Sequence, residues 1–339
     1  MNDKRSRIDT DVDFERGGKQ VSYLRVPYSS NVSAYGWIGV PIAVINNGEG
    51  PSVLCMAGNH GDEYEGQIAL AKFVREVDAA RVRGRLIVLP ATNLPAAMAG
   101  ARVSPIDDGN LNRRFPGDPD GPPTDMIAHY LTTELLPMCT AVVDLHSGGN
   151  TLHYLPSALT REHPDPRIFA CTMAALEAFA APYAYVSPAC GEERTLIAVA
   201  QSLGLIAIGT ELGGSGAVTP TTIGVAERGL RNLLVHFEVI DPAYRRPGDD
   251  APPSRVMYVR PETHYVYAPA PGLFEPAFEL GDEVSAGDLA GHVHFVDDPL
   301  RPPEPAHFAG SGLVICRRAP APVQRGDCVA HLAEDYDRA

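Results

Sequence analysis

The 339-residue sequence predicts an α/β fold with a mostly parallel or mixed central sheet flanked by helices, followed by a small C-terminal all-β barrel-sandwich module. Three observations support this fold class. Short runs of continuous apolar residues alternate with segments of helical periodicity, as expected when strands are buried on both faces. A polar, proline-rich segment interrupts this alternation near residue 241. Beyond it, the sequence becomes β-like and weakly repetitive.

The elements of the first part follow from these two periodicities. Loosely alternating residues 21–45 predict an N-terminal hairpin. Four continuous apolar runs predict buried strands at residues 53–57, 86–89, 141–145 and 205–209. Apolar residues at i, i+3, i+4 and i+7, or close to that spacing, predict helices over residues 70–77, 127–135, 196–203 and 230–237.

The proline-rich segment DPAYRRPGDDAPPSR, residues 241–255, is the expected linker. We therefore predict a larger domain over residues 1–245 and a β-rich domain over residues 246–339.

The β-rich domain contains a weak internal repeat. APAPGLFEPAFELGDEVSAGDLAGHV is similar to HFAGSGLVICRRAPAPVQRGDCVAHL, with Gly272 aligned to Gly312. Two such units predict a small sandwich with internal two-fold symmetry, a pattern that resembles the biotinyl/lipoyl carrier modules. Because the sequence has no lysine after Lys72, this module has no attachment point for a prosthetic arm.

Composition excludes several classes of function. A net charge of −14 with no basic run disfavours nucleic-acid binding. No apolar stretch approaches the ~18 residues of a membrane span, and the polar first residues lack the apolar segment of a signal peptide. The six cysteines form no C-x-x-C pair, so we expect a cytoplasmic protein with reduced thiols.

Candidate functional residues follow three of the predicted strands. His60 and Glu63, spaced H-x-x-E, follow the first strand; His146 follows the third, and Glu211 follows the fourth. Because the carboxyl ends of parallel strands meet at one edge of a sheet, we expect these side chains to converge. Taken singly, each could be a loop histidine or a helix-capping or salt-bridged acid. Together they predict a catalytic zinc site with a carboxylate base beside it.

A loop with the sequence ARVSPIDDGNLNRRFPG carries further candidates. Arg102, Arg113 and Arg114 lie there with Asn110 and Asn112. A guanidinium group recognises a carboxylate through two parallel hydrogen bonds, which predicts a substrate-carboxylate site. The alternative is surface charge, chiefly for Arg114.

Four more residues keep two interpretations each. Asp144, two residues before His146, is either an orienting carboxylate or a structural hydrogen-bonding group. Arg194 either contacts substrate or is surface charge. His292 and His294 lie on one face of a predicted strand and form either a second metal site or an ordinary surface.

Four motifs follow one another along the chain: G-N-H-G-D-E, N-L-N-R-x-F-P-G, D-L-H-S-G and T-E-L-G-G. This ordered set resembles the succinylglutamate desuccinylase/aspartoacylase family, whose members are related to zinc carboxypeptidases. The resemblance covers roughly residues 50–240 and implies a zinc carboxypeptidase-like fold. It implies one zinc ion per chain held by His60, Glu63 and His146. It also implies four further site residues: Glu211 as general acid/base, Asn112 and Arg113 for the substrate carboxylate, and Arg102 for the oxyanion.

The activity implied by this resemblance is hydrolysis of the amide bond of a small-molecule N-acyl amino acid. The variant R-V-S-P-I-D-x-x-N-L-N-R-R-F-P-G is most similar to the branch with the N-acetyl-diaminobutyrate deacetylases of ectoine breakdown. Two alternatives stay open: a metallocarboxypeptidase acting on a short or modified peptide, and a non-catalytic metal- or ligand-binding scaffold. The sequence is compatible with a homo-oligomer.

Overall fold

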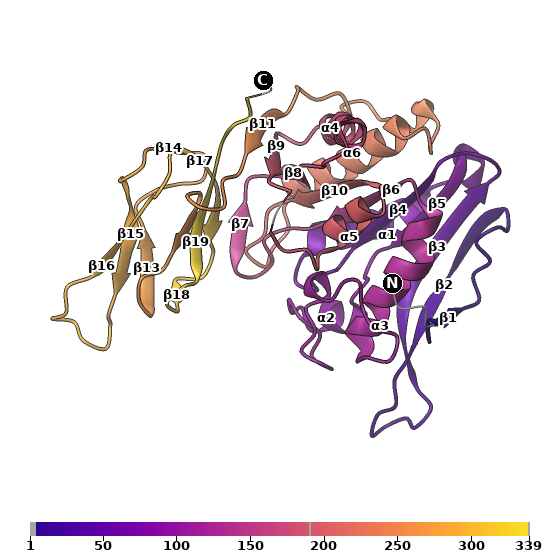
Figure 1. The fold of residues 1–339 in the computed structure, drawn as a ribbon, viewed down its shortest axis with the longest axis horizontal. Coiled ribbons are helices and arrows are strands. Elements are labelled where there is room, and N and C mark those ends of the chain that lie inside the picture. Colours follow the sequence, from indigo (N-terminus) through magenta and orange to yellow (C-terminus); the bar gives the residue numbers. More distant parts are fainter. Residues whose placement is uncertain (1–4, 190, 338–339) are drawn as a thin grey trace.

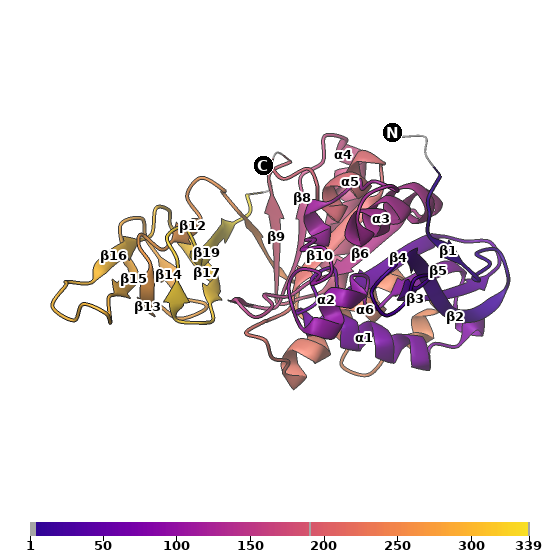
Figure 2. The same cartoon turned by 90° about the horizontal axis from the view of Figure 1, so that it is seen from below.

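The computed structural model describes residues 5–189 and 191–337. Figure 1 shows an α/β part and a group of C-terminal strands that projects from one side of it, and Figure 2 shows the same arrangement from below. Within the described residues, fifteen strands belong to one large sheet and four to a second sheet.

The α/β part contributes the first ten strands to the large sheet. Their bounds are β1 (Asp9–Thr10), β2 (Gly18–Pro27), β3 (Trp37–Asn47), β4 (Ser52–Ala57), β5 (Gly84–Leu89), β6 (Ala141–Leu145), β7 (Leu152–Tyr154), β8 (Ser157–Arg161), β9 (Tyr183–Ser187) and β10 (Ile206–Glu211). Nine of them lie in the order β1-β2-β3-β5-β4-β6-β10-β8-β9. The neighbours β5, β4, β6 and β10 are parallel, whereas β2-β3, β3-β5 and β10-β8 are antiparallel. The sheet is therefore mixed, and the predicted N-terminal hairpin is β2-β3.

The continuous apolar runs arise because the central strands are covered on both faces. Every residue of β4 and β6 is buried. Successive side chains of a strand point to opposite faces, so Val53 and Cys55 enter one core layer while Leu54 and Met56 enter the other. Such strands lose the polar–apolar alternation that marks a half-exposed strand.

Helices cover both faces of the sheet. The first core layer contains apolar residues from α1 (Tyr64–Glu76), α4 (Pro166–Phe179) and α6 (Pro220–His236). The second contains residues from α3 (Pro123–Tyr130) and α5 (Leu196–Ser202). The predicted helix over residues 127–135 is only partly regular, because α3 passes into a π-helical turn, Leu131–Leu135. The helices α4 and α2 (Leu94–Ala99) were not predicted.

The remaining strands follow the predicted linker. Their bounds are β11 (Arg255–Tyr258), β12 (Tyr265–Tyr267), β13 (Gly272–Pro276), β14 (Glu283–Val284), β15 (Leu289–His294), β16 (Glu304–His307), β17 (Gly312–Arg318), β18 (Pro322–Val323) and β19 (Cys328–Asp335). The large sheet continues through β9-β11-β19-β17-β14, while β16-β15-β13-β18 form the second sheet. Five of the nine strands from β11 to β19 thus belong to the large sheet, because β11 pairs with β9 on one side and β19 on the other.

The internal repeat corresponds to two strand triplets, β13-β14-β15 and β17-β18-β19. Each short middle strand pairs with the first strand of the other triplet: Val284 lies opposite Gly312, and Val323 lies opposite Gly272. This reciprocal exchange is what an internal two-fold arrangement requires. The apolar side chains between the triplets form a core of their own.

The predicted linker is anchored to the α/β part. In that segment, Asp249 is buried and accepts two hydrogen bonds from Arg231 on α6, at 2.7 and 2.9 Å. The proline-rich composition therefore marks an irregular but fixed connection.

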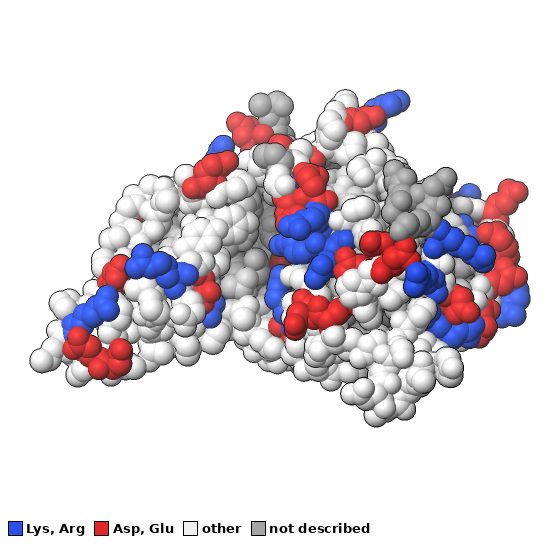
Figure 3. Space-filling model, turned by 60° about the horizontal axis from the view of Figure 1, so that its bottom comes forward, with Lys and Arg blue, Asp and Glu red and all other residues white. Residues whose placement is uncertain are grey.

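The surface carries charges of both signs, and Figure 3 shows them interspersed on the face that it displays. No helix in the part of the chain that the structure describes is both long and apolar enough to cross a membrane. The five cysteines in that part are free thiols, and Cys190 lies outside it.

Candidate metal centre and active site

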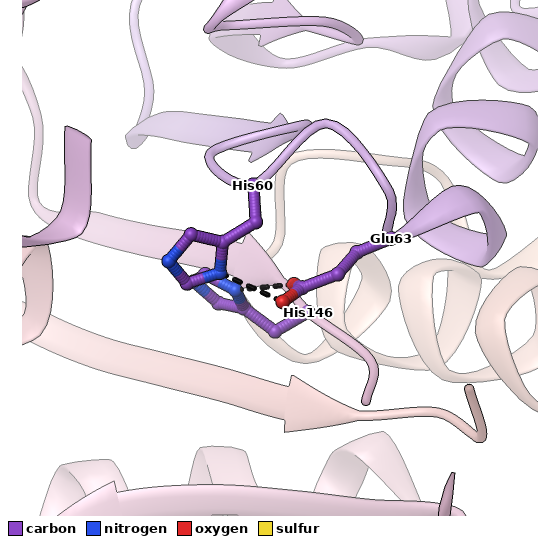
Figure 4. A group of neighbouring side chains, drawn as sticks. All are labelled: His60, Glu63 and His146. Atoms are coloured by element: carbon purple, nitrogen blue, oxygen red, sulfur yellow. Dashed lines mark hydrogen bonds and ion pairs between the residues drawn. The ribbon is translucent and has the colours of Figure 1, made fainter. Parts of the chain in front are cut away.

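The predicted metal ligands come together at the carboxyl ends of neighbouring strands. Strand β4 pairs in parallel with β6, which pairs in parallel with β10. His60 and Glu63 lie in the loop between β4 and α1, and His146 directly follows β6. One potential ligand atom from each of the three lies within 4.8 Å of the others. Figure 4 shows the three side chains pointing toward one another.

Two glycines let the β4–α1 loop turn in this space. Gly58 has a left-handed backbone conformation with a φ of +66°. Gly61 lies so close to α2 that an added Cβ would be 1.9 Å from the carbonyl carbon of Ala96. The loop therefore depends on glycine to place His60 and Glu63 at the end of the strand.

The carboxylate of Glu63 lies between the two imidazoles. Its Oε1 is 2.7 Å from Nδ1 of His60, and its Oε2 is 2.6 Å from Nδ1 of His146. On the far sides, Nε2 of His146 is 2.7 Å from Asp144 Oδ2, and Nε2 of His60 is 3.1 Å from Asn110 Oδ1. With each Nε2–H donating to an oxygen, Nδ1 is the ring nitrogen of each histidine that is placed to bind a metal beside Glu63. Two imidazole nitrogens and one carboxylate fit the ligand set of a catalytic zinc ion.

Asp144 contacts this centre directly. It lies on β6 two residues before His146, so both side chains point to the same side of the chain. Asn59 donates a hydrogen bond of 2.9 Å to Asp144 Oδ2, the oxygen that faces the imidazole. The carboxylate is thereby fixed against the ring of His146.

The two glutamates of the site have opposite electrostatic environments. Burial alone would raise the pKa of Glu63, but His60 and His146 hold it well below its usual range. Burial raises the pKa of Glu211, the last residue of β10, and the charge of Glu63 adds to this shift. Glu211 Oε2 is buried without a hydrogen-bond partner in the described structure. A carboxyl group in this state can exchange a proton near neutral pH.

The candidate carboxylate-binding loop borders the same centre. Asn112 Oδ1 accepts a hydrogen bond of 3.0 Å from the backbone of Leu196 at the start of α5, which fixes the loop against that helix. Arg113 donates from Nη1 to the carbonyl of Asn112 at 2.7 Å. Arg102 Nη1 is 3.4 Å from Glu63 Oε1.

All seven predicted site residues line one cavity of about 340 Å³: His60, Glu63, Arg102, Asn112, Arg113, His146 and Glu211. The cavity is also lined by residues that sequence reasoning missed, chiefly Tyr154 on β7, Arg161 on β8 and Tyr265 on β12. These three belong to no motif, and only the docking of the strands brings them to the site.

Other candidates lie apart from the metal centre. Arg114 is 3.6 Å from Asp125, and Arg194 bonds Glu192 beside the cavity. His294 pairs with Glu275 on an exposed strand face. Among the residues that the structure describes, the one cluster with metal-ligand geometry is the His60–Glu63–His146 group.

Comparisons with known proteins agree with this architecture. Residues 49–237 match the family model of the succinylglutamate desuccinylase/aspartoacylase catalytic domain. N-alpha-acetyl-L-2,4-diaminobutyric acid deacetylase of Halomonas elongata is 39% identical over 97% of this chain and 95% of its own length.

Two solved structures are similar over nearly the whole chain. A succinylglutamate desuccinylase/aspartoacylase from Rhodobacter sphaeroides has a TM-score of 0.91 at 42% identity, covering 98% of this chain and all of that one. The product-bound ectoine utilization protein EutE (DoeB) from Ruegeria pomeroyi has a TM-score of 0.92 at 37% identity, with the same coverage. The motifs at the strand ends, the family match and these relatives agree, and the chain belongs to the succinylglutamate desuccinylase/aspartoacylase family.

Proposed function

We propose that this protein is a zinc-dependent amidohydrolase that removes a small acyl group from an N-acyl amino acid, with N-acetyl-L-2,4-diaminobutyrate as the substrate. The observation that carries the proposal is the single cavity that contains a metal-ligand group, a buried glutamate and an arginine suited to a carboxylate. The named activity of the Halomonas elongata relative supports the choice of acyl group and amino acid.

His60, Glu63 and His146 would hold one zinc ion. When bound, zinc polarises the acyl carbonyl and makes water more acidic. In that site Asp144 keeps the ring of His146 in the tautomer whose Nδ1 is free to bind a metal. Asn110 does the same for His60.

Glu211 would move the proton. Its carboxylate accepts a proton from the attacking water and then donates it to the amine that leaves. Burial, which raises its pKa, suits both halves of this cycle. Arg102, next to Glu63, would donate to the developing oxyanion, and Arg113 with Asn112 would bind the substrate carboxylate.

The Glu211→Gln variant tests this assignment. Because Glu211 is not one of the three metal ligands, the variant should keep its zinc while turnover falls by about 10²–10⁴-fold. Zinc content and kcat are measured on the same preparation. Glu238→Gln, which changes an exposed partner of Arg83, is the matched control and should keep full activity. Near-normal turnover of Glu211→Gln would show that another group moves the proton.

A hydrolysis panel separates the proposal from its alternatives. N-acetyl, N-succinyl and dipeptide substrates are compared at equal concentration with zinc present. We expect the N-acetyl amino acid to be preferred. Preference for dipeptides would favour a metallocarboxypeptidase, and zinc binding without any hydrolysis would favour a non-catalytic scaffold.

The C-terminal part has a proposed role as well. We propose that residues 246–339 form a carrier-like barrel-sandwich domain attached to a catalytic domain of residues 1–245. The reciprocal pairing of β14 and β18 supports that shape. Free cysteines in the described residues support a cytoplasmic location.

A further inference from the structure

The charged side chains that line the cavity are three arginines and two glutamates. Arg102, Arg113 and Arg161 line it, and the two carboxylates in the described lining are Glu63 and Glu211. Under the proposed function both glutamates are committed, one to the metal and one to proton transfer. The lining therefore contains no further carboxylate for a positively charged part of a substrate.

Two consecutive glutamates, Glu192 and Glu193, each form an ion pair with one of these arginines. Residues 191–194 directly precede Thr195, which lines the cavity. In this segment, Glu192 Oε2 is 3.6 Å from Nε of Arg113. The neighbouring Glu193 has its Oε1 2.8 Å from Nη2 of Arg161. Glu193 thus compensates Arg161, whereas Glu192 is shared between Arg113 and Arg194.

The carboxylate of Glu192 is fixed, ionised and accessible. Arg194 holds it with two hydrogen bonds of 2.9 and 3.0 Å, and the backbone N–H of Arg194 adds a third at 3.0 Å. These contacts lower the pKa of Glu192 to about 2, so the group is ionised at neutral pH. About a third of its side chain remains exposed and can be reached by a ligand.

We propose that Glu192, assisted by Glu193, makes the enzyme selective for N-acyl amino acids whose side chain ends in an ammonium group. This inference rests on the proposed function, in which Arg113 binds the α-carboxylate. An amino group only a few bonds from that carboxylate then lies beside the Arg113–Glu192 pair, where Glu192 attracts it. Glu193 neutralises Arg161 and so removes a repulsive charge from the same region.

The same arrangement disfavours a substrate with an anionic side chain. A second carboxylate a few bonds from the first would approach the negative charge of Glu192. Repulsion of the wrong ligand adds to attraction of the right one, as in other charge-selective sites.

Three N-acetyl amino acids that share the α-carboxylate but differ in side-chain charge test the inference: N-acetyl-2,4-diaminobutyrate (cationic), N-acetyl-2-aminobutyrate (neutral) and N-acetylaspartate (anionic). The kcat/KM of each is measured for the wild type, Glu192→Gln, Glu193→Gln and the Glu238→Gln control. We expect the wild type to prefer the cationic substrate. Glu192→Gln should lower the cationic-to-neutral ratio by about two- to fivefold, the range of an exposed ion pair, and raise the relative rate on the anionic substrate. Glu193→Gln should show a smaller shift in the same direction, and the control none.

The cationic-to-neutral ratio of kcat/KM separates a change in selectivity from general damage to the site. Misplacement of Arg113 affects all three substrates alike, because each carries the α-carboxylate. Its effect therefore cancels in the ratio of kcat/KM values. An unchanged ratio in Glu192→Gln, including an equal loss on all three substrates, overturns the inference. Failure of the wild type to hydrolyse any of the three overturns the proposed function instead.

Discussion

At the scale of single residues, the proposed metal centre depends on which nitrogen of each imidazole is left free. Glu63 faces both Nδ1 atoms, while Asp144 and Asn110 accept from the two Nε2 atoms. A ring that is held in this way needs no reorientation when a metal binds. Ligand geometry is therefore built into the protein before the ion arrives.

The Asp144→Asn variant tests whether the carboxylate of Asp144 holds the ring of His146 in place for the metal. Asparagine keeps the size of the side chain but removes the charge that holds the Nε2 proton of His146. We expect zinc affinity to fall by about 10–100-fold while the fold is retained. Competition with a chromophoric chelator gives the affinity, and circular dichroism checks the fold. Equal affinities for the variant and the wild type would reduce Asp144 to a packing residue.

The site residues also show what sequence could predict at this scale. His60, Glu63, His146 and Glu211 could be found because each stands at the end of a recognisable apolar strand. Tyr265 could not, since one tyrosine in a β-rich stretch carries no sign that its strand docks at a distant cavity.

At the scale of elements, the β4–α1 loop is confined by α2. A Cβ on Gly61 would overlap the backbone of Ala96, so the loop and the helix fit only with glycine at this position. The position of two proposed metal ligands, His60 and Glu63, is thereby coupled to a helix that contributes no ligand.

Gly61→Ala should disturb the metal centre and the stability together. The added methyl group must push the loop away from α2, at a cost of about 1–3 kcal/mol, and displace His60 and Glu63. We expect a lower melting temperature and less than one zinc ion per chain, measured by thermal denaturation and metal analysis. Gly224→Ala on α6 is the control, because its Cβ meets nothing within 4 Å and alanine favours a helix. A Gly61→Ala protein with full zinc content would contradict this coupling.

Prediction of elements succeeded where burial leaves a simple pattern. The fully buried β4 and β6 appear as apolar runs, interrupted within β6 only by Asp144. Helix α4, which packs into the first core layer, was not predicted. The sequence of α4 does carry helix signals, since Asp165 caps its first turn, Pro166 is its first residue and its buried residues have helical spacing. The helix α3 ends in a π-helical turn, which the spacing of apolar residues in the sequence does not predict.

At the scale of the whole molecule, the C-terminal strands help to build the cavity that contains the proposed active site. Strand β7 of the α/β part pairs with β17, and β12 carries Tyr265 to the cavity wall. Behind it, the ring of His331 on β19 stacks on Tyr265 with ring centroids 4.2 Å apart and meets Tyr154 edge-on. Linker composition and the internal repeat predicted a second module, but not that its strands would continue the central sheet.

The charge of the cavity lining differs from the charge of the molecule as a whole. The chain carries a net charge of −14, yet the cavity is lined by arginines whose charges are partly compensated by glutamates at the rim. Recognition of a small substrate therefore depends on a few oriented groups, because the overall field of the protein would repel an anion.

The central claim is that hydrolysis requires a metal ion held by His60, Glu63 and His146. Its most direct measurement is the rate of acetate release from N-acetyl-L-2,4-diaminobutyrate by the purified protein before chelation, after chelation and after zinc is restored. We predict that activity falls to background when the metal is removed and returns when about one equivalent of zinc per chain is added. Full activity in the metal-free protein would contradict the claim.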